Sequence, residues 1–147
     1  MSNPDARTEP FRTAIRVRYA DTDAAGVVNY ANYLSYFGVA RAEAYRELGV
    51  PVTEIEARGV ILPVVEVSCR YLRSALLDDL LEVDLWLAEI EAVRFSFKYD
   101  VRRDAELLAT GSTRQAVIDY QTRRPVRYPD WLRSLLERFP RLESVDQ

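Results

Sequence analysis

The chain has 147 residues, of which 48% are apolar and 29% are charged, a composition typical of one globular domain. Its 23 acidic and 20 basic residues leave a net charge of -3, so it lacks the basic excess expected of a nucleic-acid-binding protein. It contains no histidine, which excludes Ser-His and Cys-His nucleophile systems and histidine-ligated metal sites. Any hydrolytic chemistry must therefore use carboxylates, backbone dipoles, tyrosine, lysine or arginine.

The predicted elements begin with a strand over residues 12–19, in which Ile15, Val17 and Tyr19 form the apolar face. A loop follows over residues 20–29. From about residue 32 the apolar positions recur at helical spacing, on a face formed by Tyr33, Phe37, Ala40, Ala44 and Leu48. Because Gly49 and Pro51 are typical of a helix end, the sequence predicts one long helix of about 17 residues.

The second half of the chain is dominated by alternating apolar and polar residues. This pattern predicts strands over residues 61–71, 80–89, 93–102 and about 107–120, with short helices over 52–58 and about 131–139. In the first of these strands the expected buried face contains Ile61, Val65, Val67, Cys69 and Tyr71. The connections between the long strands are short, as in antiparallel hairpins.

These elements predict an α+β fold, with an antiparallel sheet of about five strands wrapped around one long central helix. One helix can cover only one face of such a sheet, so the other face and the sheet edges need a partner. We therefore expect a homo-oligomer, either a dimer or a tetramer.

The single cysteine, Cys69, cannot form a disulfide within the chain, which fits a reducing compartment. No run of about 18 apolar residues could cross a membrane, and the N-terminal residues are too polar for a signal peptide. We therefore expect a cytoplasmic protein with one domain over residues 12–140, flanked by flexible tails at 1–11 and 141–147.

The most distinctive stretch is YADTDAAGVVNYANYLSYF at residues 19–37, where the first strand leads into the helix. It places two carboxylates, Asp21 and Asp23, shortly before the helix, with Gly26 in the loop between. A carboxylate at a helix N-terminus either stabilises the loop and helix or takes part in chemistry. Asp23 is the closer to the helix entrance, whereas Asp21 is better placed to hold the loop, but spacing alone leaves both roles open.

This stretch, read as D-x-D-x-x-G-V-V followed by N-Y-A-N-Y-L-x-Y-F, closely resembles the 4-hydroxybenzoyl-CoA thioesterase family of hotdog-fold acyl-CoA thioesterases, especially its YbgC-like members. The resemblance covers roughly residues 12–128 and includes the later strings YLRSA and DDL. It implies a hotdog fold and hydrolysis of a CoA thioester, with a short-chain or aromatic acyl group, to the free acid and CoA. A thioesterase acting on acyl carrier protein and a non-catalytic acyl-binding hotdog module are the alternatives.

The resemblance also implies roles for single residues. Asp23 would be the catalytic carboxylate, and Gly26 would shape the loop that presents it. The backbone N–H near Tyr30 would polarise the thioester carbonyl, while Asn32 and Tyr33 match the Asn-Tyr pair that enters the helix in this family. Many YbgC-like members carry a histidine where Tyr30 stands, which leaves open which group, if any, assists the attacking water.

Further contacts to an acyl-CoA substrate are expected from Arg94 and Lys98, which share one face of a predicted strand and could meet the CoA phosphates. The spacing by itself favours solvated strand cations over phosphate contacts for this pair. It likewise favours a solvated position for Glu66 over a place in a neighbouring subunit's site. No metal or cofactor is expected. No general acid is needed either, because a thiolate leaves readily. The sequence does not decide whether Asp23 attacks the carbonyl or activates water.

Overall fold

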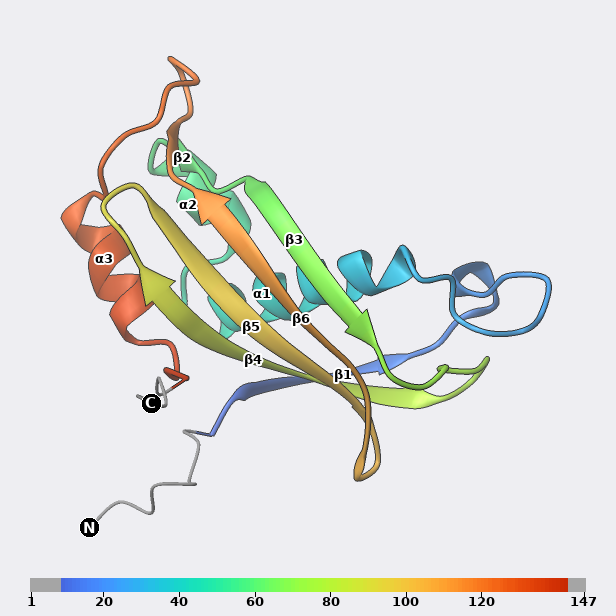
Figure 1. The fold of residues 1–147 in the computed structure, drawn as a ribbon. Coiled ribbons are helices and arrows are strands. Elements are labelled where there is room, and N and C mark those ends of the chain that lie inside the picture. Colours follow the sequence, from blue (N-terminus) through green and yellow to red (C-terminus); the bar gives the residue numbers. More distant parts are fainter. Residues whose placement is uncertain (1–8, 143–147) are drawn as a thin grey trace, which may run out of the picture.

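The computed structural model describes residues 9–142, so most of the two expected tails lies outside the described residues (Figure 1). The strands are β1 (Phe11–Arg16), β2 (Val60–Ile61), β3 (Val64–Tyr71), β4 (Leu80–Ile90), β5 (Arg94–Arg103), β6 (Glu106–Ala116) and β7 (Ile118–Asp119). The helices are α1 (Asn32–Glu47), α2 (Val52–Ala57) and α3 (Asp130–Glu137), with a short 3-10 turn, η1 (Tyr19–Asp21), after β1. Within the described range no helix is both long and apolar enough to span a membrane.

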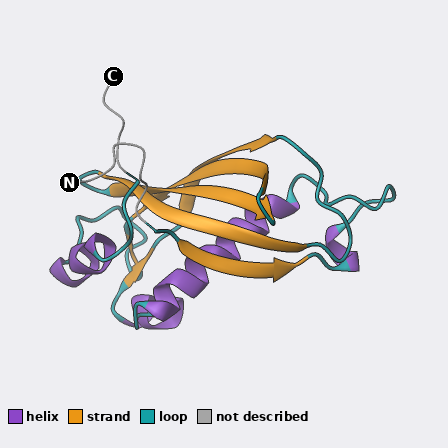
Figure 2. Cartoon of the chain, turned by 90° about the horizontal axis from the view of Figure 1, so that it is seen from below, coloured by secondary structure: helices purple, strands orange, loops and turns teal. Residues whose placement is uncertain are grey.

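The five long strands form one antiparallel sheet in the order β1-β4-β5-β6-β3, and β2 pairs separately with β7. The sheet curves across α1, which lies against one of its faces (Figures 1 and 2). This arrangement confirms the predicted α+β hotdog fold, in which about five antiparallel strands surround one long helix.

The core forms where α1 meets the alternating side chains of the central strands. As predicted, one face of β4 and β5 is fully buried. Its side chains are Leu81, Val83, Leu85, Leu87, Phe95, Phe97, Tyr99 and Val101. On α1, Phe37 stacks on Tyr99 with ring centroids 4.2 Å apart. Gly111 of β6 allows this close approach, because a Cβ atom there would lie 2.4 Å from the Phe37 ring.

The first predicted strand was wrong at its C-terminal end. β1 stops at Arg16, and Tyr19 belongs to η1 with 82% of its surface exposed. The turn forms because the Asp21 side chain accepts a hydrogen bond from the backbone N–H of Arg18 at 3.0 Å, a local contact that competes with continued strand pairing.

The predicted buried face of β3 was also wrong. Val65, Val67 and Tyr71 are each 45% exposed, although their alternation with polar residues matched that of the buried strands. β3 is an edge strand that pairs only with β6. Its apolar residues therefore lie at the margin of the sheet, outside the core that α1 forms with β4 and β5.

Candidate active site

Asp21 is buried at the end of η1, with 2% of its surface exposed. Its carboxylate accepts hydrogen bonds from the Arg18 backbone N–H at 3.0 Å, from Arg18 Nη2 at 2.9 Å and from Tyr36 Oη at 3.0 Å. Burial raises the pKa of Asp21, but hydrogen bonds to the carboxylate, led by those from Arg18 and including that from Tyr36, together outweigh it and lower the pKa to about 2. These contacts connect the turn to α1 and support the loop-stabilising role expected for Asp21.

Asp23 opens a tight loop that projects from the fold. Its backbone N–H donates to the Val27 carbonyl at 2.9 Å, and its carbonyl accepts from the Gly26 N–H at 3.0 Å. Gly26 has φ +80°, a conformation that side chains other than glycine rarely adopt. The exposed Asp23 carboxylate accepts one hydrogen bond through Oδ1, from the Ala25 N–H at 2.8 Å, and Oδ2 has no partner among the described residues. One carboxylate oxygen is therefore available to a substrate or a water molecule.

The entrance to α1 leaves one backbone donor unused. The Asn29 N–H donates to the Asp21 carbonyl at 2.9 Å, and the Asn32 N–H donates to the Asn29 carbonyl at 2.9 Å. The Ala31 N–H donates to Asn29 Oδ1 at 3.0 Å. Between them, the Tyr30 N–H has no hydrogen-bond partner in residues 9–142. A free N–H at a helix N-terminus, aligned with the helix dipole, is a donor suited to a developing negative charge.

A tyrosine cluster lies beside this donor. It lines a pocket of about 240 Å³ formed by Val28, Tyr30, Tyr33, Tyr71, Leu72, Arg73 and Ser74. The Tyr71 ring meets Tyr33 and Tyr30 edge-on, at centroid distances of 5.2 and 6.3 Å. Asn32 contributes a buried Nδ2 atom without a hydrogen-bond partner among the described residues. The structure thus brings Tyr30, Asn32 and Tyr33 together at the helix entrance.

Sequence reasoning did not single out Tyr71 as a site residue, although it lies in one of the strings that carried the family resemblance. Its hydroxyl donates to the Tyr30 carbonyl at 2.8 Å across 41 residues of chain. Strand periodicity assigned Tyr71 only to a buried face, because a contact between two such distant segments leaves no local pattern.

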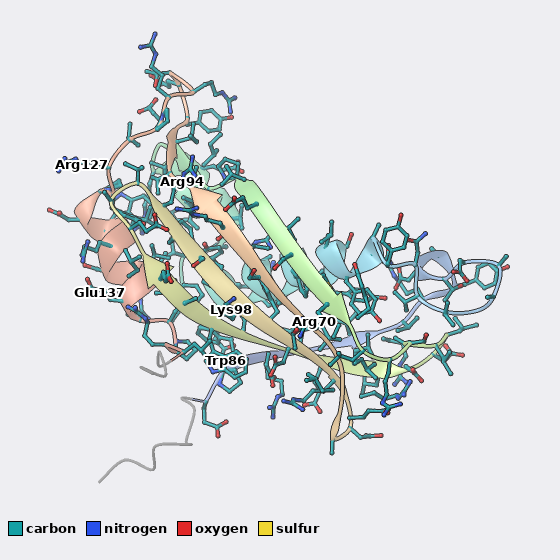
Figure 3. The ribbon with its side chains drawn as sticks, in the orientation of Figure 1. Arg70, Trp86, Arg94, Lys98, Arg127 and Glu137 are labelled. Carbon is teal, nitrogen blue, oxygen red and sulfur yellow. The ribbon has the colours of Figure 1, made fainter. Side chains whose placement is uncertain are left out.

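The two predicted CoA-binding cations do not join this cluster within one chain. Arg94 lies at the start of β5 and Lys98 near its middle, on the sheet face opposite α1 and well away from the loop before α1 (Figure 3). Lys98 lines an open depression of about 540 Å³ on that face. Glu66 also lines it and forms an ion pair with Arg114 at 3.2 Å.

A separate pocket of about 290 Å³ lies between α1, α2 and the segment before β3. Beside it runs a buried polar chain in which Arg41 Nη1 donates to Tyr99 Oη at 3.1 Å. Tyr99 Oη and Gln115 Nε2 each lie 2.6 Å from Thr113 Oγ1. Gln115 Oε1 and Tyr45 Oη are buried in the same region without a hydrogen-bond partner among residues 9–142. Such unpaired groups reduce the stability of the isolated chain.

Comparison with known proteins identifies the family of the chain. The model of the thioesterase-like superfamily matches residues 17–136. The acyl-CoA thioesterase YbgC of Haemophilus influenzae is 33% identical over 120 residues, covering 81% of this chain and 88% of that protein. The 1,4-dihydroxy-2-naphthoyl-CoA hydrolase of Synechococcus elongatus is 34% identical over 122 residues, covering 79% and 90%.

A solved structure shows the same similarity in three dimensions. The DHNA-CoA thioesterase of Staphylococcus aureus superposes with a TM-score of 0.79 at 32% identity, covering 86% of this chain and 88% of that one. The family model spans most of the chain and includes both the aspartate loop and α1. The chain therefore belongs to the thioesterase-like superfamily.

Proposed function

We propose that this protein is an acyl-CoA thioesterase in which Asp23 acts at the thioester carbonyl. The proposal depends on two groups that remain available to a substrate. One carboxylate oxygen of Asp23 and the backbone N–H of Tyr30 each have no hydrogen-bond partner among the described residues. Both belong to one short segment between η1 and α1. Relatives named as acyl-CoA thioesterases and hydrolases support the reaction class.

The chemistry needs two groups on opposite sides of the reacting carbon. The Tyr30 N–H and the dipole of α1 would stabilise the negative charge that develops on the thioester oxygen. The Asp23 carboxylate would either attack the carbonyl carbon, giving an acyl-enzyme anhydride that water then hydrolyses, or remove a proton from the attacking water. In both cases the C–S bond breaks and CoA leaves as its thiolate, which needs no general acid because thiols ionise near pH 8.5. The products are the free acid and CoA.

The tyrosine-lined pocket favours an aromatic acyl group. The pocket beside the Tyr30 N–H is lined by the rings of Tyr30, Tyr33 and Tyr71. An aromatic acyl ring could pack against the faces and edges of these rings. Two of the named relatives act on a dihydroxynaphthoyl thioester, which is also aromatic. A carrier-protein thioesterase is the second candidate, because its acyl group would reach the same carboxylate on a phosphopantetheine arm.

The proposed site is open in a single chain, so we also propose that it is completed by a second copy. The exposed apolar side chains Val65 and Val67 lie on β3, an edge strand with one unpaired side. Pairing of two β3 strands would extend the sheet and cover this edge. Arg94 and Lys98 are proposed to meet the CoA phosphates at or near such an interface, with further pairing of dimers giving a tetramer. The single cysteine is consistent with a cytoplasmic location.

The decisive experiment measures free thiol release from a panel of aliphatic and aromatic acyl-CoA substrates. We expect wild-type turnover to exceed that of Asp23→Asn by at least about 100-fold in kcat, because the substitution removes a nucleophile or general base. Asp104→Asn is the matched control, since Asp104 is an exposed aspartate in the turn between β5 and β6. Undiminished kcat in Asp23→Asn would refute the proposed mechanism. Absence of thiol release by the wild-type protein with any acyl-CoA would refute the reaction itself.

A further inference from the structure

The proposed mechanism requires the Tyr30 N–H to face one direction in the pocket, which depends on the shape of its turn and on how that turn is placed against the sheet. Local contacts fix the shape, because the Asn29 carbonyl, in the same planar peptide unit as the Tyr30 N–H, accepts from the Asn32 N–H at 2.9 Å, and Asn29 Oδ1 accepts from the Ala31 N–H at 3.0 Å. Contacts that would hold the turn against the sheet are weaker. The Tyr30 carbonyl accepts a hydrogen bond from the Tyr33 N–H at 3.4 Å, which is long for the first turn of a helix. The Tyr30 ring is 71% exposed and is not held by the core. Ala31, at the N-cap of α1, provides no side-chain hydrogen bond. The placement of this turn against the sheet therefore depends on a contact from another element.

Tyr71 supplies that contact from β3. Its hydroxyl donates to the Tyr30 carbonyl at 2.8 Å, the shorter of the two hydrogen bonds to that oxygen. Because the local hydrogen bonds at Asn29 make the turn one unit, holding the Tyr30 carbonyl also holds the Tyr30 N–H in place beside the pocket.

Tyr71 is itself held in place. It ends β3 in register with Ala109 of β6, so its backbone belongs to the sheet. Its ring packs edge-on against Tyr33, which is 2% exposed. Burial raises the pKa of Tyr71 to about 12, so the hydroxyl keeps its proton and remains a donor at neutral pH. A group placed on a strand holds its partner more rigidly than one placed on a loop.

We propose that Tyr71 is a positioning residue for thioester hydrolysis, which holds the Tyr30 carbonyl so that the Tyr30 N–H faces the thioester oxygen. This role rests on the proposed function and extends it to a residue of β3. Tyr71 acts through Tyr30 and contributes no group to the bond changes. Tyr71 should stabilise the transition state more than the bound substrate, because the negative charge on the thioester oxygen is greatest in the transition state.

The first test is Tyr71→Phe, which keeps the ring that lines the pocket and removes only the hydroxyl. A single net hydrogen bond is equivalent to about a two- to tenfold effect, so we expect kcat to fall by about that factor while KM and the melting temperature stay near the wild-type values. Tyr120→Phe is the control, because Tyr120 is 42% exposed and follows β7, outside the tyrosine cluster. Unchanged kcat in Tyr71→Phe, or a fall matched by Tyr120→Phe, would overturn the proposal.

A second measurement separates positioning from a general structural role. Benzoyl-CoA labelled with ¹³C at the thioester carbonyl is bound to the Asp23→Asn variant, which is expected to retain the ligand without rapid turnover. We expect the bound carbonyl resonance to lie downfield of that in free benzoyl-CoA, because the Tyr30 N–H polarises it, and to move back toward the free value when Tyr71→Phe is added. An identical resonance with and without the Tyr71 hydroxyl would overturn the proposal. Failure of the proposed function has a different signature, namely full activity in Asp23→Asn.

Discussion

Replacing Asp21 with asparagine tests whether the two aspartates of the loop divide structure and chemistry between them. Asn keeps the shape of the side chain but removes the charge that Arg18 and Tyr36 stabilise. The pKa of Asp21 falls from 3.8 to about 2 in the folded protein. At about 1.4 kcal/mol for each pKa unit, the ionised carboxylate favours folding by roughly 2 kcal/mol at neutral pH. We expect Asp21→Asn to lose about that much unfolding free energy.

The pH dependence of this loss follows from the sign of the pKa change. The folded pKa lies below the unfolded value, so the stabilisation is complete above about pH 5 and disappears as the pH falls from about 4 toward 2. Urea unfolding of wild-type and Asp21→Asn proteins at pH 7 and at a series of lower pH values measures it directly. At pH 7 the difference corresponds to a melting temperature about 4–8 °C lower for a chain of this size.

The catalytic readout completes the comparison. Among folded molecules we expect Asp21→Asn to keep kcat within about threefold of wild type, in contrast to the loss of at least about 100-fold expected for Asp23→Asn. A stability loss below about 0.5 kcal/mol at pH 7 would refute the argument from the pKa, as would a difference that persists undiminished near pH 2. A large fall in kcat in Asp21→Asn with normal stability would reverse the two roles.

Four further outcomes test the fold and the substrate. Gly111→Ala should destabilise the protein by about 1–3 kcal/mol in urea unfolding, since its Cβ atom would meet the Phe37 ring at 2.4 Å; wild-type stability would show that the ring can move aside. Tyr45→Phe should leave thermal stability unchanged or raise it by about 1 kcal/mol, because the buried hydroxyl has no partner among the described residues; a clear loss would mean that a water molecule, ligand or second copy pairs with it. Light scattering at micromolar concentration should give the mass of a dimer or tetramer, and a monodisperse species of 16.9 kDa would contradict the pairing of β3 strands. Acyl-pantetheine thioesters without the nucleotide should be cleaved with lower kcat/KM than the CoA forms, and equal values would favour a carrier-protein substrate.

Local patterns were sufficient for most of the secondary structure. The helical spacing of apolar residues predicted the helix observed at Asn32–Glu47, and Gly49 follows it with φ +86° as expected for a helix end. Strict alternation identified the buried faces of β4 and β5. These features depend on contacts between residues a few positions apart, or on a regular repeat of positions that face one core. Both are visible in the amino-acid sequence.

Contacts with distant segments of the chain determined which strand residues are buried and where a strand ends, and the alternation of apolar residues could not predict either. The pattern of β3 resembles that of the central strands, yet Val65 and Val67 are exposed because β3 lies at the edge of the sheet. Edge and central strands differ in what lies beside them, and a strand's own sequence does not specify its neighbour. β1 likewise ended early because the Asp21 side chain competes with strand pairing at Arg18.

The same division applies to the candidate site. By itself the sequence determined the aspartate loop, the glycine turn and the entry to the long helix, since Asp23, Gly26 and Tyr30 lie within eight consecutive residues. The tertiary structure decided which groups are free to act: it buries and pairs the Asp21 carboxylate, and leaves the Tyr30 N–H without a partner among residues 9–142. It also brings the Tyr71 hydroxyl to the Tyr30 carbonyl from 41 residues away. Hydrogen-bond satisfaction depends on every segment that folds against a group, so only the assembled chain determines which donors and acceptors remain for a substrate.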